Sequence, residues 1–261
     1  MIMGTPIRRA AMLAIATLVL ALPRVLDAAE PIRLSYPYLT DREARVAGFR
    51  PLAERASQGY VHVVIIYPGD PSKEDDPPGV LQQASGLIAD AAGHVVTNAH
   101  IARSTKNTAK VIARDGSEHA ARIIYLDPKH DLALLRIKPF RGMRPVRFGS
   151  AKALKKGDVL LAVGSPSRGR GTVSVGFVRI PRIDERIPYN QWSIVNAIEI
   201  AMQVESGHSG GPVFDRSGAL VGIVAGYELG DTTKRPYVSP RITYAIPADE
   251  VQAFLARALR R

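Results

Sequence analysis

The stretch Gly207-His208-Ser209-Gly210-Gly211-Pro212 places one serine between glycines. An acyl-transfer enzyme needs a hydroxyl that acts as nucleophile and, beside it, backbone N–H groups that bind the developing oxyanion. Glycines leave such N–H groups unobstructed because they carry no Cβ and adopt positive φ. A Ser-Gly-Gly sequence is also compatible with an ordinary small-residue turn. The stretch by itself therefore makes Ser209 a candidate nucleophile and no more.

A serine hydroxyl needs a base at neutral pH, and the usual base is a histidine that a carboxylate orients. His100 follows the apolar run Val95-Val96, so we expect it at the end of a strand, next to small residues. Asp131 lies directly before another apolar strand. A carboxylate in that position is costly to bury without a partner, and His100 would be a suitable one. Taken alone, Asp131 fits a solvated loop carboxylate better.

The remaining histidines show no metal-ligand spacing. His94 and His100 are six residues apart on either side of a strand, and neither an H-E-x-x-H motif nor any cysteine is present. We expect His62, His119 and His130 to be structural or exposed. The sequence therefore predicts no metal site and no cofactor.

Short β-rich runs, separated by turns, make up most of the chain and predict the elements that must position these residues. The first set of predicted strands is Val61–Tyr67, Ala84–Ala89, His94–Asn98, Lys110–Ala113, Ala120–Tyr125 and Leu132–Ile137. The second set is Asp158–Val163, Thr172–Ile180, Asn196–Val204, Pro212–Phe214, Ala219–Ala225 and Arg241–Ile246. Two sets of six short strands indicate an all-β protein with two antiparallel barrels or sandwiches.

Only the C-terminal end reads clearly as a helix, which begins near Pro247 and has apolar residues at helical spacing. We divide the chain into a signal peptide (1–29), an N-terminal segment that could form an amphipathic helix (30–60), a first barrel (61–145), a second barrel (146–246) and this helix (247–261). Arg8 and Arg9, a short apolar run and small residues near position 29 are typical of a secretory signal. An uncleaved membrane anchor is the alternative.

Composition limits the compartment and the partners. The 261 residues include no cysteine, so an exported protein of this size must be held by its core without disulfides. We therefore expect a bacterial periplasmic or extracellular location. The net charge of +11 favours contact with anionic envelope surfaces. The basic residues are dispersed and aromatic residues are few, so we expect no nucleic-acid binding. The oligomeric state stays open.

The order of the motifs resembles the trypsin-like serine proteases, and more narrowly their HtrA (Deg) branch. Thr97-Asn98-Ala99-His100, then Asp131-Leu132-Ala133-Leu134, then Gly207–Pro212 carry this resemblance. Val163-Gly164-Ser165-Pro166 and Tyr244-Ala245-Ile246-Pro247 are also similar to that branch. The resemblance covers about residues 50–258 and implies a chymotrypsin-like fold of two six-stranded antiparallel barrels with a C-terminal helix. No PDZ module follows in these 261 residues, so we expect a branch member without one.

The resemblance also implies roles for individual residues. Ser209 would be the nucleophile, His100 the base and later the acid, and Asp131 the group that orients the histidine. The N–H groups of Gly207 and Ser209 would form the oxyanion hole. A protein or peptide substrate would pair with the strand that ends at Val224-Ala225-Gly226. Further substrate-binding candidates, listed together, are Gln203, Val204, Ala225, Gly226 and Tyr227.

His208 departs from the family pattern, because the HtrA branch usually has asparagine at this position. Two interpretations are open: an inert surface residue, which we favour, or a residue that affects how the loop is ordered. The segment Met202–Ser206 also departs from the usual small and apolar run, which leaves the side-chain preference undecided.

We therefore expect a secreted serine endopeptidase that forms an acyl-enzyme intermediate. The alternative from a different class is a latent double-barrel binding or scaffold protein, active only with a partner or not at all. An esterase is a weak third interpretation, because we expect no strand-to-helix nucleophile elbow here.

Overall fold

The protein is described from a computed structural model, which places residues 34–35, 49, 51–67, 79, 81–166, 171–189, 192–228 and 242–260. The predicted signal peptide, residues 1–29, lies outside these residues, as does most of the segment 30–60. Within that segment, residues 51–56 are helical and continue into the 3-10 turn η1 (Ser57–Gly59).

The first barrel closes from six antiparallel strands in the order β2-β3-β4-β7-β6-β5. These strands are β2 (Tyr60–Ile66), β3 (Leu81–Ile88), β4 (His94–Thr97), β5 (Thr108–Ile112), β6 (Glu118–Asp127) and β7 (Leu132–Ile137). The pairing of β2 with both β3 and β5 closes the ring. A one-turn helix, α2 (Ala99–Ala102), follows β4.

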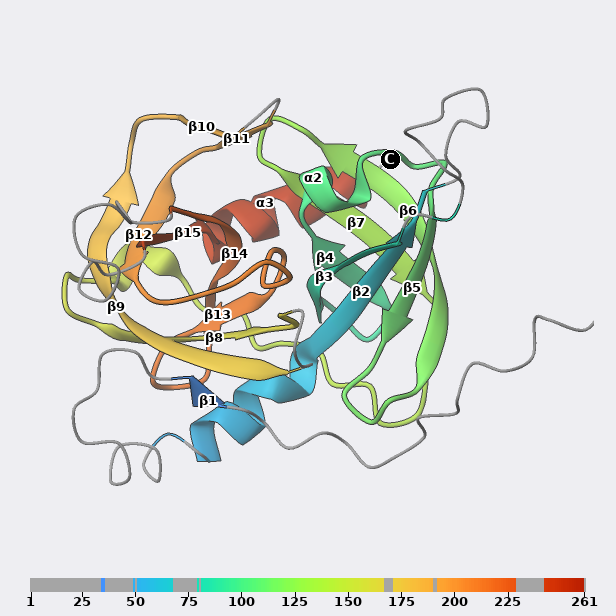
Figure 1. Ribbon diagram of the computed structural model, residues 1–261, viewed down its shortest axis with the longest axis horizontal. Helices are drawn as coiled ribbons and strands as arrows, with labels where there is room; N and C mark the ends of the chain where they lie inside the picture. Colours follow the sequence, from blue (N-terminus) through green and yellow to red (C-terminus); the bar gives the residue numbers. More distant parts are fainter. Residues whose placement is uncertain are drawn as a thin grey trace, which may run out of the picture.

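The second barrel is the left-hand unit of Figure 1, and its strands run in the order β9-β12-β15-β14-β13-β8, with β8 paired back to β9. They are β8 (Val159–Gly164), β9 (Thr172–Ile183), β12 (Ala197–Ala201), β13 (Pro212–Phe214), β14 (Leu220–Glu228) and β15 (Ile242–Pro247). The 3-10 turn η2 (Ala151–Ala153) precedes this barrel. The prediction of two six-stranded antiparallel barrels is therefore confirmed.

Three short strands were not predicted from the sequence. β1 (Leu34–Ser35) adds to the second barrel in parallel with β9, and β10 (Ile187–Tyr189) pairs with β11 (Trp192–Ile194) as a separate ribbon. Each is only two or three residues long, which is too short for a period-2 pattern to be recognised.

Alternation along the strands sends neighbouring side chains into different cores. Val95 packs inside the first barrel, whereas Val96 packs in the cluster between the barrels. Likewise, Leu135 packs inside the first barrel, and Leu134 packs in the cluster between the barrels. The central cluster also contains residues of both barrels and of the C-terminal helix, so it joins the two barrels into one hydrophobic unit.

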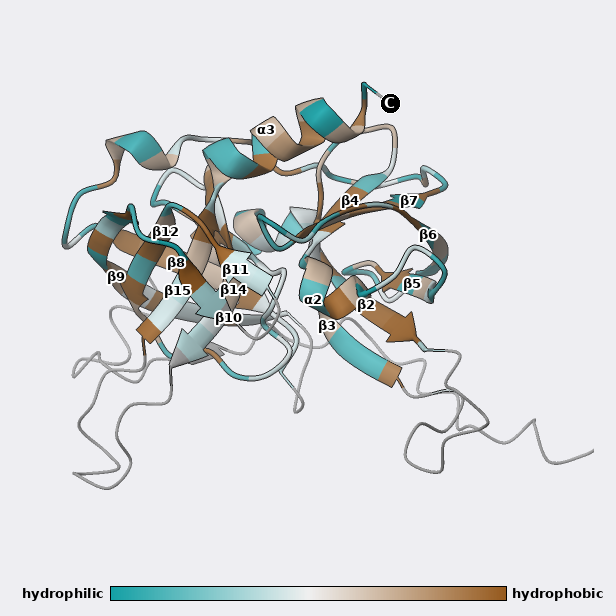
Figure 2. Cartoon of the chain, turned by 90° about the horizontal axis from the view of Figure 1, so that it is seen from above, coloured by the Kyte–Doolittle hydropathy of each residue, from teal (hydrophilic) through white to brown (hydrophobic). Residues whose placement is uncertain are grey.

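The predicted terminal helix is present as α3 (Ala248–Ala258). Val251 and Phe254 are fully buried in the central cluster, and Figure 2 shows α3 extending from the second barrel toward the first. Arg257 near its end donates to Asp127 of β6 at 2.9 Å. The helix thus connects both barrels on one side of the molecule. None of the helices in the described ranges is long and apolar enough to cross a bilayer.

Candidate active site

His100 and Asp131 are brought together by the first barrel. His100 Nδ1 lies 2.7 Å from Asp131 Oδ2, and the backbone N–H of His100 donates to Asp131 Oδ1 at 2.8 Å. The Asp131 carboxylate is fully buried, and the His100 side chain is 10% exposed. A carboxylate that accepts from Nδ1–H leaves Nε2 as the acceptor nitrogen of the neutral ring. The pair therefore has the arrangement that a general base requires.

The local backbone explains how Asp131 reaches this position. Its φ is +52°, an uncommon value for a residue with a side chain. Its carbonyl accepts from the Asn98 side-chain amide at 3.1 Å and from the Ala99 N–H at 3.2 Å. These bonds connect it to the start of α2, which carries His100, so the histidine lies on a helical turn and not at the strand end itself. The neighbouring structure holds a conformation that costs about 1–3 kcal/mol.

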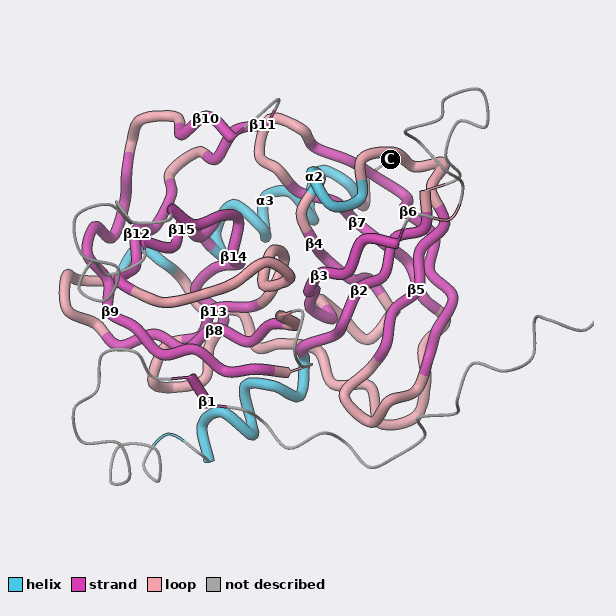
Figure 3. Tube along the Cα trace, viewed as in Figure 1, coloured by secondary structure: helices cyan, strands magenta, loops and turns pink. Residues whose placement is uncertain are grey.

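Ser209 lies in the loop between β12 and β13, which in Figure 3 runs from the second barrel toward β3 and β4. The loop is held by its own turns and by β14. His208 N–H donates to Glu205 O at 3.1 Å, and Gly211 N–H donates to His208 O at 2.8 Å. Val224 of β14 accepts from Gly210 N–H and donates to Gly211 O, both at 2.8 Å. The loop is followed by a strand, so it is not a strand-to-helix elbow.

Contacts with the first barrel bring the Ser209 loop to the elements that carry His100. Ser85 N–H of β3 donates to Ser209 O at 2.9 Å. Gly210, with φ +81°, fits so closely under β3 and β4 that a Cβ there would lie 2.2 Å from Ser85 O and 2.3 Å from Thr97 Oγ1. Thr97 is three residues before His100. The structure therefore brings the predicted nucleophile loop and the His100 segment to the same place between the barrels.

Two N–H groups of this loop remain available. Within the described part of the chain, the N–H groups of Gly207 and Ser209 donate no hydrogen bond to another residue. Gly207 has φ +98°, a value that favours glycine. A Cβ at Gly207 would lie 1.9 Å from Ser165 O, so the position has no room for a side chain. Unpaired donors on either side of His208 are what an oxyanion hole needs.

His208 is buried, with 2% of its surface exposed, so the favoured prediction of an inert surface residue is wrong. Its ring packs on Gly164, where a Cβ would lie 2.5 Å from the ring, and its Nδ1 is within hydrogen-bond distance of the Glu205 N–H and C=O. Nε2 is buried without a partner in the described residues. Burial lowers the pKa of His208 to about 4, against an upward effect of the Glu205 backbone contact.

The predicted substrate-binding residues divide into two groups. Val204 and Ala225 are fully buried, and both belong to hydrophobic cores. Gln203 and Tyr227 are partly exposed, and Tyr227 packs against the same cluster as Val204. Gly226 is buried in the backbone of β14. The side chains of Val204 and Ala225 therefore contribute chiefly to packing.

Beyond Val224, one edge of β14 pairs with no described strand. β13 pairs with β14 only up to Ile223, whereas β15 pairs with the opposite edge as far as Glu228. Residues 225–227 therefore present backbone groups next to the Ser209 loop. Such an edge is suited to an added strand.

Sequence reasoning missed the polar residues that hold this region together. Ser85, Thr97 and Thr243 are all fully buried polar residues, and Thr243 Oγ1 donates to Met202 O at 2.8 Å. Their sequence signal was weak, because a serine or threonine within a strand pattern is common.

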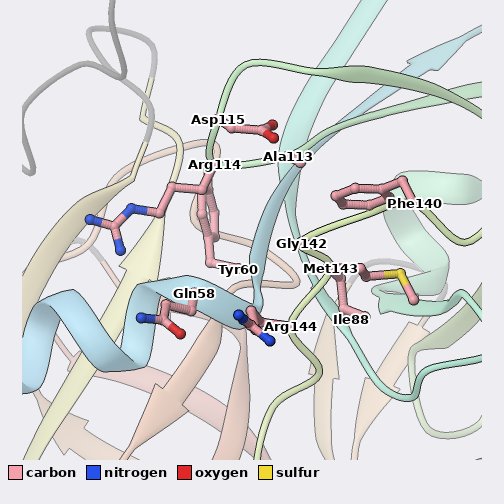
Figure 4. Close-up of a pocket in the computed structure, with 10 residues that line it drawn as sticks. All are labelled: Gln58, Tyr60, Ile88, Ala113, Arg114, Asp115, Phe140, Gly142, Met143 and Arg144. Atoms are coloured by element: carbon pink, nitrogen blue, oxygen red, sulfur yellow. The ribbon is translucent and has the colours of Figure 1, made fainter.

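A separate pocket of about 400 Å³ lies between the first barrel, Gln58 before it and residues 140–144 after it (Figure 4). Its lining includes the apolar residues Tyr60, Ile88, Phe140 and Met143 and the basic residues Arg114 and Arg144. None of the predicted catalytic residues lines it. We assign it no role in the chemistry.

No group of three potential metal ligands occurs among the residues that the structure places. Three of the remaining histidines have local partners: His94 pairs with Asp90 at 2.6 Å, His130 with Asp127 at 2.8 Å, and His119 stacks on Phe140. His62 is buried in β2. These histidines therefore have structural surroundings.

Two closed antiparallel barrels that meet along a shared core are the architecture of chymotrypsin-like proteins. Comparison with known proteins agrees. The family model described as trypsin-like peptidase domain matches residues 84–223. Serine protease HTRA1 of Xenopus laevis is 34% identical over 178 residues, which cover 68% of this chain and 36% of that protein.

Two other relatives give the same result. The probable periplasmic serine endoprotease DegP-like of Brucella suis biovar 1 (strain 1330) is 39% identical over 143 residues, which cover 54% of this chain and 27% of that protein. Serine protease HTRA1A of Danio rerio is 27% identical over 235 residues, which cover 90% of this chain and 44% of that protein. The chain thus spans less than half the length of these relatives. It belongs to the trypsin-like peptidase family, and the proteins that it resembles are of the HtrA type.

Proposed function

We propose that this chain is a serine endopeptidase that cleaves protein or peptide substrates through an acyl-enzyme intermediate. The observation that carries the proposal is the buried His100–Asp131 pair, located where β3 and β4 contact the Ser209 loop. The family membership and the serine proteases among the relatives support it.

In this mechanism Ser209 Oγ attacks the scissile carbonyl carbon while His100 Nε2 takes the hydroxyl proton. Asp131 keeps the ring in the required tautomer and stabilises the imidazolium that forms. The carbonyl oxygen becomes an oxyanion, and the unpaired N–H groups of Gly207 and Ser209 would bind it. His100 then gives its proton to the leaving amine, and water hydrolyses the acyl-enzyme in a second cycle of the same steps.

The substrate would lie as an added strand along residues 225–227 of β14. This edge is next to the Ser209 loop, so a paired peptide would present its carbonyl to the nucleophile. Gln203 and Tyr227, the partly exposed members of the predicted set, are the side chains that we expect to influence specificity.

A fluorophosphonate probe tests this function directly. The probe should label the protein once, at Ser209, and Ser209→Ala should abolish labelling. Ser217→Ala, at an exposed serine on the turn after β13, should label as the wild type does. A protein that stays unlabelled, even with an unfolded protein present, would instead support the latent binding or scaffold protein.

Digestion of casein, with mapping of the cut sites, tests the endopeptidase activity and gives the side-chain preference. Internal cuts at many positions are expected. Release of single terminal residues alone would contradict endopeptidase activity.

We further propose export to the periplasm or the cell exterior, on the basis of residues 1–29. N-terminal sequencing of protein from the periplasmic fraction of a bacterial host should give a start near residue 30. The proposal includes contact with anionic envelope surfaces, on the basis of the net charge of +11. Among the described arginines, Arg179 pairs with Glu199, and Arg182 pairs with Asp184.

A further inference from the structure

The N–H, the carbonyl and the hydroxyl of Ser85 all form hydrogen bonds, and their partners belong to both barrels. Its N–H donates to Ser209 O at 2.9 Å, and its hydroxyl donates to Gly207 O at 2.7 Å. The same Oγ accepts from Ser165 N–H at 2.9 Å, and its carbonyl accepts from Thr97 Oγ1 at 2.7 Å. Ser85 is fully buried. A buried serine with four such bonds has its side chain and backbone fixed in one orientation.

These bonds fix the loop on either side of His208. The carbonyl of Gly207 and that of Ser209 are held by Ser85, and these are the two residues whose N–H groups remain unpaired in the described chain. Gly207 also packs directly on the Ser165 carbonyl. The Gly207 carbonyl shares its planar peptide unit with the His208 N–H, and the Ser209 carbonyl shares its unit with the Gly210 N–H. Holding these two units limits the rotation of the units that directly precede them, which carry the N–H groups of Gly207 and Ser209.

We propose that Ser85 is a positioning residue that holds the oxyanion loop of the second barrel from β3 of the first. This inference rests on the proposed function. Ser85 acts through Gly207 and Ser209 and not by contact with the reacting atoms. The network extends to Tyr60, whose hydroxyl forms a hydrogen bond with Ser165 Oγ. Tyr60 begins β2, so β2 and β3 both contribute to this support.

Ser85→Ala removes the hydroxyl and keeps the backbone N–H bond to Ser209. It leaves Gly207 O and Ser165 N–H without their partner. Since removal of a whole oxyanion donor costs about 100-fold or more, displacement of a donor that is still present should cost less. We expect kcat to fall on the order of 10- to 100-fold, with KM changed by less than about 3-fold.

The matched control is Ser57→Ala. Ser57 is also buried, and its Oγ donates to the backbone carbonyl of Glu54 at 3.1 Å, away from the loop. A second variant, Tyr60→Phe, keeps the aromatic packing and removes only the hydroxyl that bonds to Ser165. We expect kcat to fall by a few-fold in Tyr60→Phe and to stay near the wild-type value in Ser57→Ala.

Three readouts separate positioning from a general loss of structure. The rate of fluorophosphonate labelling should fall in parallel with kcat in Ser85→Ala. The acid limb of the pH profile should stay in place, because the His100–Asp131 pair is untouched. Hydrogen–deuterium exchange of residues 205–211 should become faster in Ser85→Ala and remain as in the wild type in Ser57→Ala.

A wild-type kcat in Ser85→Ala would overturn the inference, whatever the exchange rates. If Ser85→Ala shows no cooperative unfolding transition, that variant is not properly folded, and the test passes to Tyr60→Phe. A wild-type kcat in Tyr60→Phe would then overturn the inference. If the wild type itself is never labelled, the proposed function fails, and exchange of residues 205–211 then decides the role of Ser85. Unchanged exchange in Ser85→Ala would overturn the positioning role independently of activity.

Discussion

The carboxylate of Asp131 accepts two hydrogen bonds from one residue, His100, through the ring Nδ1–H at 2.7 Å and the backbone N–H at 2.8 Å. The first bond fixes the tautomer, and the second fixes the position of the carboxylate relative to α2. Both oxygens therefore bond to the histidine, which fixes the orientation of the carboxylate.

Asp131→Asn should reduce kcat on the order of 1,000- to 10,000-fold while the protein remains folded. The amide keeps the shape of the side chain, but its NH₂ group cannot accept from Nδ1–H, so the histidine changes tautomer. Steady-state kinetics and the Tm of each variant measure the two effects. Asp90→Asn is the matched control, because Asp90 forms a similar pair with His94 at 2.6 Å outside the proposed site. Equal losses of activity in both variants would contradict the role of Asp131.

His208 should make the fold sensitive to acid. Burial lowers its pKa from 6.5 to about 4, so the folded state favours the neutral ring. The neutral His208 ring makes its full contribution to the free energy of unfolding above about pH 6.5. This contribution is lost as the pH falls to about 4, because in that range His208 is protonated in the unfolded chain and not in the folded chain. The loss amounts to roughly 3 kcal/mol of the free energy of unfolding.

Urea denaturation at pH 7 and at pH 4 measures this contribution. Other groups also titrate in this range, so the comparison is with His208→Asn, which cannot titrate. We expect the wild type to lose more stability than His208→Asn between the two pH values. Equal losses would show that the buried ring does not control acid stability.

Gly207→Ala should be far more harmful than an alanine at another glycine with positive φ. A Cβ at Gly207 would lie 1.9 Å from Ser165 O, whereas at Gly157, with φ +92°, nothing lies within 4 Å. Gly157→Ala therefore reports the backbone strain alone, about 1–2 kcal/mol. Gly207→Ala should cost on the order of 1–3 kcal/mol more and abolish labelling of Ser209. Similar stability of the two variants would mean that the loop moves away without cost.

The contact of Arg257 with Asp127 should contribute to the docking of α3. Burial raises the pKa of Asp127, but hydrogen bonds and charges of Arg257 and His130 outweigh it, so the pKa is lowered overall. The contribution of the Arg257–Asp127 contact to the free energy of unfolding is therefore present at neutral pH. It is lost as the pH falls below the ordinary carboxyl pKa of about 3.8. Arg257→Ala should lower the free energy of unfolding by roughly 0.5–1 kcal/mol at pH 7.

The same substitution should have a smaller effect at acid pH, below the ordinary value of about 3.8, because the lowered pKa of Asp127 means that its charge is lost only there. Arg260→Ala is the control, since Arg260 donates within the helix to Ala256 O. An effect of Arg257→Ala that does not depend on pH would show that the arginine acts through packing and not through its charge.

Most strands of both barrels could be located from the sequence, and the strands of at least five residues were all found. Leu132–Ile137 has the predicted bounds, because a continuous apolar run delimited by polar residues has only one good placement in a barrel wall. β9 extends three residues beyond the predicted Ile180, and β10 and β11 were missed. The ends of a strand and the presence of very short strands depend on pairing partners elsewhere in the chain, so a local sequence pattern does not predict them.

The sequence by itself determined the fold class, the order of the histidine, aspartate and serine motifs, and the family to which the chain belongs. These depend on residue types and their periodicity, which are local properties. The tertiary structure alone decided that His208 is buried on Gly164, that Asp131 adopts positive φ, and that Ser85 of one barrel holds the loop of the other. Each of these depends on contacts between segments that are distant in the chain. Such contacts form only when the barrels pack together, so no short stretch of sequence predicts them.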